Sequence, residues 1–476
     1  MALVNVLQTG KSGMSTAKAG IATAGHNISN AGTEGYSRQR VQSEAEVGKQ
    51  IAGQGGHFVG EGSRISKIER INDEYLERQL REGARDMAFH EERQVFLNQV
   101  EDIFNEMGGD GLNRLIARFY NDFRKLSNEP TSEAIRQAVR ESSQAMVSDF
   151  RRLRAEVESV RSHIDHRIEG NLKELNSFAQ ELADLNRRVR QSEVTGTDAA
   201  NDLRDRRDLI LKKISELVDV TSHKDNEGNV NVDIKGVGPL VTGTVIEKYA
   251  VGRHGSGHAP GAIDNSFQIS RSAFANQAIT DQFKGGKIGA QIEVRDKSVN
   301  QVLARLDELA HSVAKSVNEL HSKGFTQDGR TGIKFFEDVR GVTGAAQSLR
   351  LSTDVSASVG NIAAALQPGA PSDNRNALAI ANLQNLRLMN SGHTTVDDFY
   401  NSIVSDVGTA ASRNRDALGQ QQSILTQLNK VRDQVSGVSI DEETTNLMQF
   451  QHAFDASARV IKVADEMMDT VLRLRG

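Results

Sequence analysis

The sequence contains no cysteine and no tryptophan, and it has only five prolines among 476 residues. Without cysteine, the chain forms no disulfide bond, thiolate nucleophile, iron–sulfur cluster or zinc–thiolate site. No run of eighteen apolar residues occurs, so the sequence predicts no membrane-spanning helix. The first residues also lack the basic region and compact apolar core of a secretory signal peptide, and we expect no such signal. A chain of this length has ample material for a buried core without disulfide bonds.

The charges of the chain are mixed rather than segregated. Acidic residues (63) slightly outnumber basic residues (58), which gives a net charge of −5. Clusters of arginine at 151–154, 187–190 and 204–207 alternate with acidic residues at helical spacing, so we predict exposed ion pairs there. This pattern does not form the basic stripe that binds nucleic acid. We therefore expect neither a nucleic-acid partner nor a membrane partner.

Both ends of the chain carry the apolar spacing of a coiled coil. From Leu3 to Ile28, apolar and small residues follow one another at alternating steps of four and three. Four glycines in this stretch each cost about 1 kcal/mol relative to alanine, so the helix should be unstable alone. From Ile440 onward, apolar residues recur at sevens after a capping box formed by Ser439 and Glu442.

We predict that these two helices order only when they pack together and against neighbouring molecules. The alternative is that their apolar seams pack only within one chain. The residues predicted to form the assembly interface are Leu3, Leu7, Met14, Ile21 and Ile28 with Leu447, Phe450, Phe454, Ile461, Met468 and Val471.

The middle of the chain predicts a long helical bundle with a small β module. Amphipathic helices are expected over 71–107, 112–126, 132–190 and 199–218, and again near 299–320 and 396–435. A shift of heptad phase allows a break in the third helix at Gly170. Alternating apolar residues and glycine turns predict short strands between 219 and 285. A second glycine-rich region, 324–373, is compatible with strands or loops.

The predicted fold class is mainly α, with discontinuous, nested domains. The N-terminal and C-terminal helices form a coiled coil, and the chain runs outward through the bundle to the β module and returns. The predicted divisions are 1–36 with 437–476 for the terminal coiled coil, 37–65 for a short extended connector, 66–218 with 286–436 for the helical bundle, and 219–285 for the outer β-rich domain.

No catalytic, cofactor or metal site is predicted. His163 and His166 lie three residues apart on a solvated helix without a third ligand, and exposed helix positions explain them better than a metal. His254 and His258 lie in a glycine-rich loop, which presents ligands poorly. The glycines between 53 and 62 do not follow a strand and open a helix as a nucleotide loop requires. No Gly-x-Ser-x-Gly motif occurs either.

The segment from His26 to Gln39, HNISNAGTEGYSRQ, resembles the signature of bacterial flagellar rod, hook and hook-associated proteins. The signature-turn residues are Asn30, Gly35 and Tyr36. One residue departs from the family pattern, because Glu34 stands where these proteins have proline. Gly35 can still supply the positive φ of a type II turn, although the turn loses the preset φ of proline.

The C-terminal stretch 436–467 and the interior blocks 200–208, 285–290 and 376–383 are similar to the hook-associated members of this family. The resemblance implies a non-enzymatic adaptor in a helical layer between hook and filament, with a helical domain around paired terminal helices. It implies self-assembly, contacts with the hook protein and with a second junction protein, and a cytoplasmic chaperone on the C-terminal helix. It also implies type III export without a cleaved signal to an extracellular flagellum.

Three alternatives remain at this point. A hook or distal-rod protein of the same family would share the terminal helices. A secreted hydrolase or adhesive protein would use the β module, with His254 and His258 in a functional role. A cytoplasmic coiled-coil scaffold would share the periodicity but would stay inside the cell.

Overall fold

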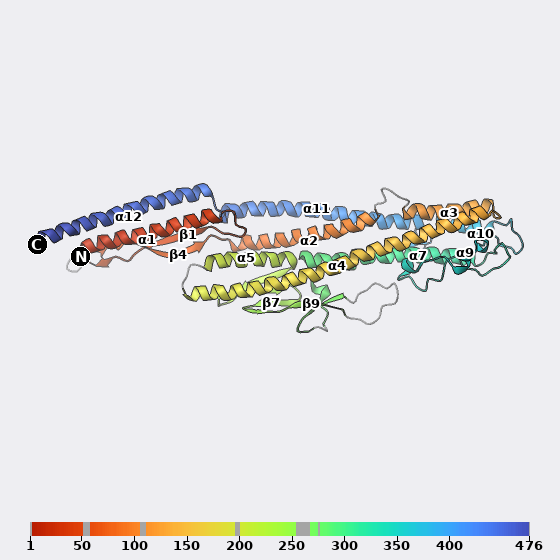
Figure 1. Cartoon of the computed structure of the whole chain (residues 1–476), viewed down its shortest axis with the longest axis horizontal. Coiled ribbons are helices and arrows are strands. Elements are labelled where there is room, and N and C mark those ends of the chain that lie inside the picture. The colour runs from red at the N-terminus through yellow and green to blue at the C-terminus, as the bar shows by residue number, and fades with distance from the viewer. Residues whose placement is uncertain are drawn as a thin grey trace.

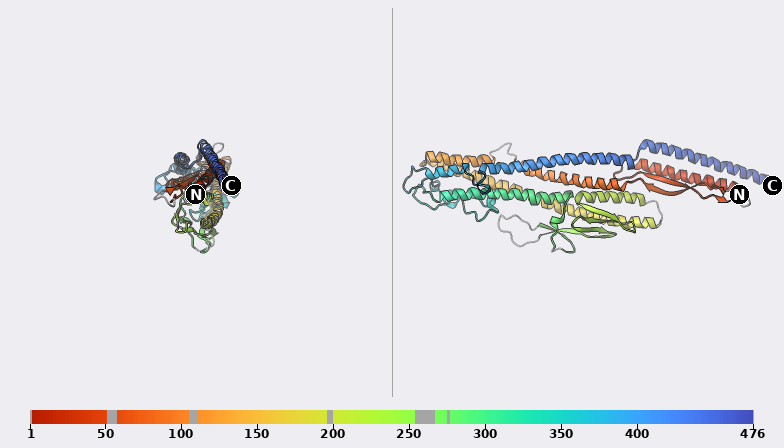
Figure 2. Two further views of the ribbon diagram at one scale, coloured as in Figure 1. Left: turned by 90° about the vertical axis from the view of Figure 1, so that its left-hand side faces the viewer. Right: turned by 180° about the vertical axis from the view of Figure 1, so that it is seen from behind.

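The computed structural model describes residues 2–50, 58–104, 111–195, 200–253, 267–274 and 277–475. The molecule is a long rod of small cross-section, with both chain ends at one pole and a β module on one flank (Figures 1 and 2). In the described part of the chain, no helix is both long and apolar enough to cross a membrane.

The pole that carries the chain ends is a pair of helices, which we call the terminal pair. It consists of α1 (Ala2–Asn30) and α12 (Ile440–Arg475), which lie side by side over most of their length (Figure 1). Both extend over the ranges that the heptad spacing predicts. Glycine and alanine on α1 allow close approach of the two backbones, because they present little or no side chain to the partner helix.

A β-hairpin runs along α1. Strand β1 (Gln39–Ala45) pairs antiparallel with β4 (Ser63–Arg70), with a bulge between Gln42 and Ser43, and the short strands β2 (Lys49–Gln50) and β3 (Phe58–Val59) continue it. The sequence predicted an extended connector over 37–65, and the structure adds the pairing and prolongs the second strand to Arg70.

The middle of the rod, which we call the body, is a bundle of long helices. Helix α4 continues through Gly170 without the break that the shift of heptad phase allows, and it is about 95 Å long. Ile168 and Leu172, on either side, are both fully buried, and their packing outweighs the cost of one helical glycine of about 1 kcal/mol. The helices of the body are α2 (Glu74–Phe104), α3 (Leu112–Asn128), α4 (Glu133–Thr195), α5 (Ala200–Leu217), α6 (Gly286–Glu293), the π-helical turn η2 (Val294–Val299), α7 (Asn300–His321) and α11 (Val396–Ser436).

At the pole opposite the chain ends, the region 324–373 folds as loops and short helices rather than as strands. Only isolated bridges such as Phe325 with Ala365 occur in its described residues. Buried Arg136 fixes two loops by donating to the carbonyl oxygens of Pro130 and Ile362. The short elements here are α8 (Ala345–Ser348), α9 (Thr353–Ala357), η3 (Val359–Asn361), α10 (Arg375–Asn382), η4 (Leu383–Asn385) and η5 (Asn390–Gly392).

The β module packs on the flank of α4 (Figure 1). Four strands are ordered β5-β6-β7-β8 and are antiparallel, and β9 pairs with β10. Two asparagines of α4 fix it in place, since Asn176 and Asn186 each exchange hydrogen bonds with backbone groups of the module. The elements are β5 (Val220–Lys224), β6 (Val230–Ile234), β7 (Gly238–Thr242), β8 (Val245–Ile246), β9 (Tyr249–Arg253), β10 (Phe267–Arg271) and η1 (Thr280–Gln282).

Candidate functional site: the terminal pair and its polar joint

The contact between α1 and α12 is built on small residues of α1. A Cβ added at Gly10 would lie 2.6 Å from a side-chain carbon of Ile461, and one added at Gly20 would lie 2.5 Å from the ring of Phe450. A Cβ at Gly13 would approach the Ser457 hydroxyl equally closely. Three of the four glycines that weaken α1 as an isolated helix are therefore positions at which α12 packs against it, whereas a Cβ added at Gly25 would meet no atom within 4 Å.

The predicted interface residues differ in how far they are exposed in the single chain. Ten of the eleven are half-buried, whereas Val471 is 52% exposed. Phe454 lines a shallow groove with Met14 and Ile21, and Leu3 lines a second groove on the same pair. The sequence analysis missed a further set of exposed apolar residues on the terminal pair: Val4, Val6, Met448, Val460, Val463, Met467 and Leu472.

The terminal pair meets the body at a cluster of buried polar residues, which we call the joint. Its centre is Asn27, near the end of α1, with 1% of its surface exposed. The Asn27 side chain donates to the backbone oxygen of Gln39 at 2.8 Å and to Glu443 at 3.0 Å. Its oxygen accepts from the Gln39 amide and from the hydroxyl of Tyr36. One side chain thus connects α1, the first strand and α12.

Arg38 attaches the start of α12 to the hairpin. Its Nε donates to Glu443 at 2.7 Å and its Nη1 donates to Glu442 at 2.8 Å. The backbone amide of Arg38 also donates to the carbonyl oxygen of Ser436, the last residue of α11. Ser439 caps α12 by accepting from the Glu442 amide, as predicted, while the Glu442 side chain reaches Arg38 instead of closing the capping box.

Helix α5 supplies the other half of the joint. Asp205 accepts from the backbone amide of Ser37 at 3.1 Å and from Arg70 at 2.9 Å, and Arg70 also contacts Asp208 at 2.6 Å. Burial raises the pKa of Asp205 to about 6, because desolvation of the carboxylate outweighs the attraction of Arg70. Two guanidinium–carboxylate clusters therefore join the terminal pair, the hairpin and the body.

The signature turn lies directly on the joint. Gly35 has φ of +81°, and the Tyr36 amide donates to the Thr33 carbonyl, as the predicted type II turn requires. Glu34, in the place of the family proline, is exposed and lies 3.6 Å from Lys212. Asn30 accepts from the Thr33 hydroxyl and donates to the His26 carbonyl. The turn thus keeps its geometry without proline.

Sequence reasoning found the turn and missed the joint as a whole. Asn27 and Arg38 come from the segment 26–39, Asp205 comes from 200–208 and Glu443 from 436–467, and no periodicity relates them. The available signal was the family resemblance, since the segments 26–39, 200–208 and 436–467 that carry it supply the residues of the joint.

The histidine candidates show no shared geometry. The ring of His163 lies edge-on to Phe96, and Nδ1 of His166 lies 2.7 Å from the Ser162 carbonyl. His254 and His258 lie outside the described residues. In the ranges that the structure describes, no group of three or more histidine, aspartate or glutamate side chains is arranged to hold a metal ion.

Two family models match the chain. The model of the helical domain of the flagellar hook-associated protein FlgK matches residues 97–336, and the model of the flagellar basal body rod FlgEFG protein C-terminal matches residues 433–474. Together with the fold and the signature turn, these matches define a structural protein of the bacterial flagellum.

Relatives and a solved structure narrow this class. Flagellar hook-associated protein 1 of Bacillus subtilis (strain 168) is 31% identical over 99% of this chain and 98% of its own length. The chain belongs to the flagellar hook-associated protein 1 family. The protein of that name from Escherichia coli (strain K12) is 23% identical over 93% of this chain and 94% of its own length.

Comparison with solved structures supports the fold of the same family. The flagellar hook junction protein FlgK from Burkholderia pseudomallei matches with a TM-score of 0.66 at 16% identity, over 75% of this chain and all of that one. The predicted class, mainly α with a small β module, is confirmed, and the chain is a structural adaptor of the flagellum.

Proposed function

We propose that this chain forms a helical layer at the junction between hook and filament. Its family membership supports this proposal, as does the name of the solved neighbour, a hook junction protein. The observation that carries the assembly step is the terminal pair, because a single chain leaves apolar residues such as Met467 and Leu472 more than half exposed. Burial of such residues favours association by about 25 cal/mol for each Å² removed from water.

The proposed partners follow from the position of this layer between the hook and the filament. Copies of the same chain would pack through the predicted interface residues of α1 and α12, with the hook protein on one side and a second hook-associated protein on the other. The role is structural and non-enzymatic. Before assembly, a chaperone would cover the C-terminal helix in the cytoplasm, and the unfolded chain would leave through the type III export channel to its extracellular position. The absence of cysteine supports export, since no disulfide bond can trap the chain.

The test is a strain that lacks this chain. We expect complete hooks without filaments, and restoration of filaments by the wild-type gene. Loss of the hook itself would instead favour a hook or rod protein, and retention of the protein inside cells would contradict export.

A matched pair of variants tests the terminal pair in the same strain. Phe454→Asp introduces a carboxylate into the groove beside Met14 and Ile21 and should prevent filament formation. Val245→Asp changes a residue that is 70% exposed on the β module and should leave filaments intact. Normal filaments with Phe454→Asp would contradict the assignment of Phe454 to the assembly interface.

A further inference from the structure

A recessed, basic pocket lies where α2 meets the start of the β module. Its volume is about 340 Å³. Helix α2 contributes Arg78, Arg81 and Arg85, which share one face because they are spaced by three and four residues. The opposite wall contains Lys235 and the hydroxyl-bearing residues Ser215, Thr221 and Ser222.

The cations of the pocket are only partly neutralised. Arg85 donates to Asp219 at 2.7 Å and also pairs with Asp86, and Lys235 lies 3.2 Å from the same oxygen of Asp219. Within the described ranges, the Arg81 guanidinium forms no ion pair and no hydrogen bond with another residue. The pocket lining holds four cations against two carboxylates, Glu82 and Asp219.

Arg81 is the group that most requires an anion. Its side chain is half-buried, and desolvation lowers its pKa, with a smaller contribution in the same direction from Arg78. Three carboxylates partly offset this lowering of the pKa by charge attraction, without a hydrogen bond to Arg81: Asp208, Glu77 and Glu82. The guanidinium of Arg81 is partly desolvated and faces the pocket without an acceptor from the described residues, and an anion that reaches it gains charge-assisted hydrogen bonds.

We propose that this pocket binds an oxyanion, with the Arg81 guanidinium as its principal donor and Arg78 and Lys235 beside it. The ligand group is a carboxylate or a phosphate, because the planar fork of arginine matches the paired oxygens of both. Two sources carry this chemistry: a carboxylate side chain of an adjoining subunit in the flagellum, or a free phosphate-type anion. Binding of the isolated anion does not depend on the function proposed above.

The first experiment measures phosphate binding to the purified full-length chain. The midpoint of thermal unfolding is followed as sodium phosphate replaces sodium chloride at constant ionic strength. We expect a saturable rise for the wild type and an affinity at least tenfold weaker for Arg81→Gln.

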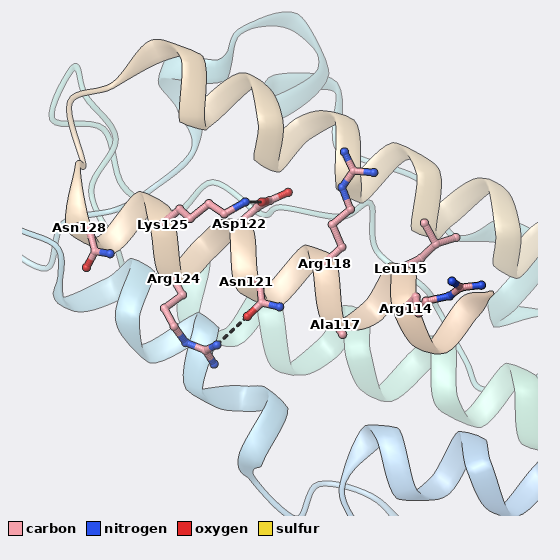
Figure 3. Close-up of a pocket in the computed structure, with 9 residues that line it drawn as sticks. All are labelled: Arg114, Leu115, Ala117, Arg118, Asn121, Asp122, Arg124, Lys125 and Asn128. Atoms are coloured by element: carbon pink, nitrogen blue, oxygen red, sulfur yellow. Dashed lines mark hydrogen bonds and ion pairs between the residues drawn. The ribbon is translucent and has the colours of Figure 1, made fainter. Parts of the chain in front are cut away.

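The control is Arg118→Gln, which removes an exposed arginine from a different pocket, on α3 (Figure 3), and should leave the phosphate response of the Arg81 pocket unchanged. Absence of a saturable rise, or an equal rise in wild type and Arg81→Gln, would overturn the site. If Arg81→Gln does not fold, Lys235→Gln replaces it as the test variant, because the Lys235 side chain is exposed and its loss should not disturb folding. An unchanged phosphate affinity in Lys235→Gln would also overturn the site.

The second experiment identifies the source. The Arg81→Gln and Arg118→Gln genes are each returned to a strain that lacks the chain. Lost phosphate binding together with a selective loss of filaments in Arg81→Gln assigns the ligand to a carboxylate of an adjoining subunit. Lost phosphate binding with normal filaments assigns it to a free anion.

Discussion

Replacement of Glu443 by glutamine should loosen the attachment of the terminal pair to the body. Glu443 is 3% exposed, and its carboxylate accepts from both Arg38 and Asn27. Breaking a fully buried ion pair costs about 3–5 kcal/mol. Because Arg38 is 22% exposed and keeps Glu442 as a second partner, we expect about 2 kcal/mol instead. Glutamine retains the size of the side chain, so the loss of stability measures the removal of the negative charge and of one acceptor oxygen.

Hydrogen exchange of amides in the first turns of α12 and the last turns of α1 measures this effect. A loss of about 2 kcal/mol corresponds to an equilibrium constant for local opening that is about thirtyfold larger, and hence to about thirtyfold faster amide exchange. The matched control is Glu442→Gln, which removes the neighbouring carboxylate from the same arginine. Since Glu442 is 63% exposed, its loss should cost at most about 0.5 kcal/mol. Equal acceleration in the two variants, or none in Glu443→Gln, would refute the joint as the element that secures the pair.

Gly25→Ala should stabilise the terminal pair by about 0.5–1 kcal/mol, because the added Cβ meets no atom within 4 Å. Gly20→Ala should instead accelerate amide exchange in α12, since its Cβ would lie 2.5 Å from a phenylalanine ring; equal effects of the two would contradict this packing. The folded-state pKa of Asp205, about 6, lies above its ordinary value, so its contribution to stability should be lost as pH rises from about 4 through about 6. The difference in unfolding midpoint between wild type and Asp205→Asn should therefore change across this range, and a constant difference would contradict the raised pKa. Deletion of 1–36 and 437–476 should leave the body folded, because no described residue of α1 or α12 belongs to the main apolar cluster; loss of cooperative melting would show otherwise.

The long helices were predictable from the spacing of apolar residues alone, whereas the short helices α6, α8, α9 and α10 were not. The range 112–126 was predicted where α3 covers Leu112–Asn128, and 199–218 where α5 covers Ala200–Leu217. Long amphipathic segments repeat the same signal over several turns, so local pattern and tertiary packing agree. The break that the sequence allows at Gly170 does not occur, because the cost of this glycine is local whereas the packing that overrides it comes from other helices.

The joint was not predictable in the same way. Asn27 and Glu443 are separated by 416 positions, and single polar residues carry no periodic signal. Heptad spacing identifies the side of α12 that faces α1, but not the exposed apolar residues on its other sides, and the residues that contact other copies stay a prediction. The nested domain boundaries given in the sequence analysis stay a prediction.

The meeting of residues 38 and 436 has a consequence for the order of folding. The Arg38 amide donates to the Ser436 carbonyl at 3.0 Å, so a folded body holds the bases of α1 and α12 next to each other. For a free chain, bringing two such distant segments together carries the entropy cost of closing a loop of nearly the whole sequence. Once the body has folded, this entropy has already been lost. The two helices can then pair progressively from the joint outward, as the two strands of a local hairpin do.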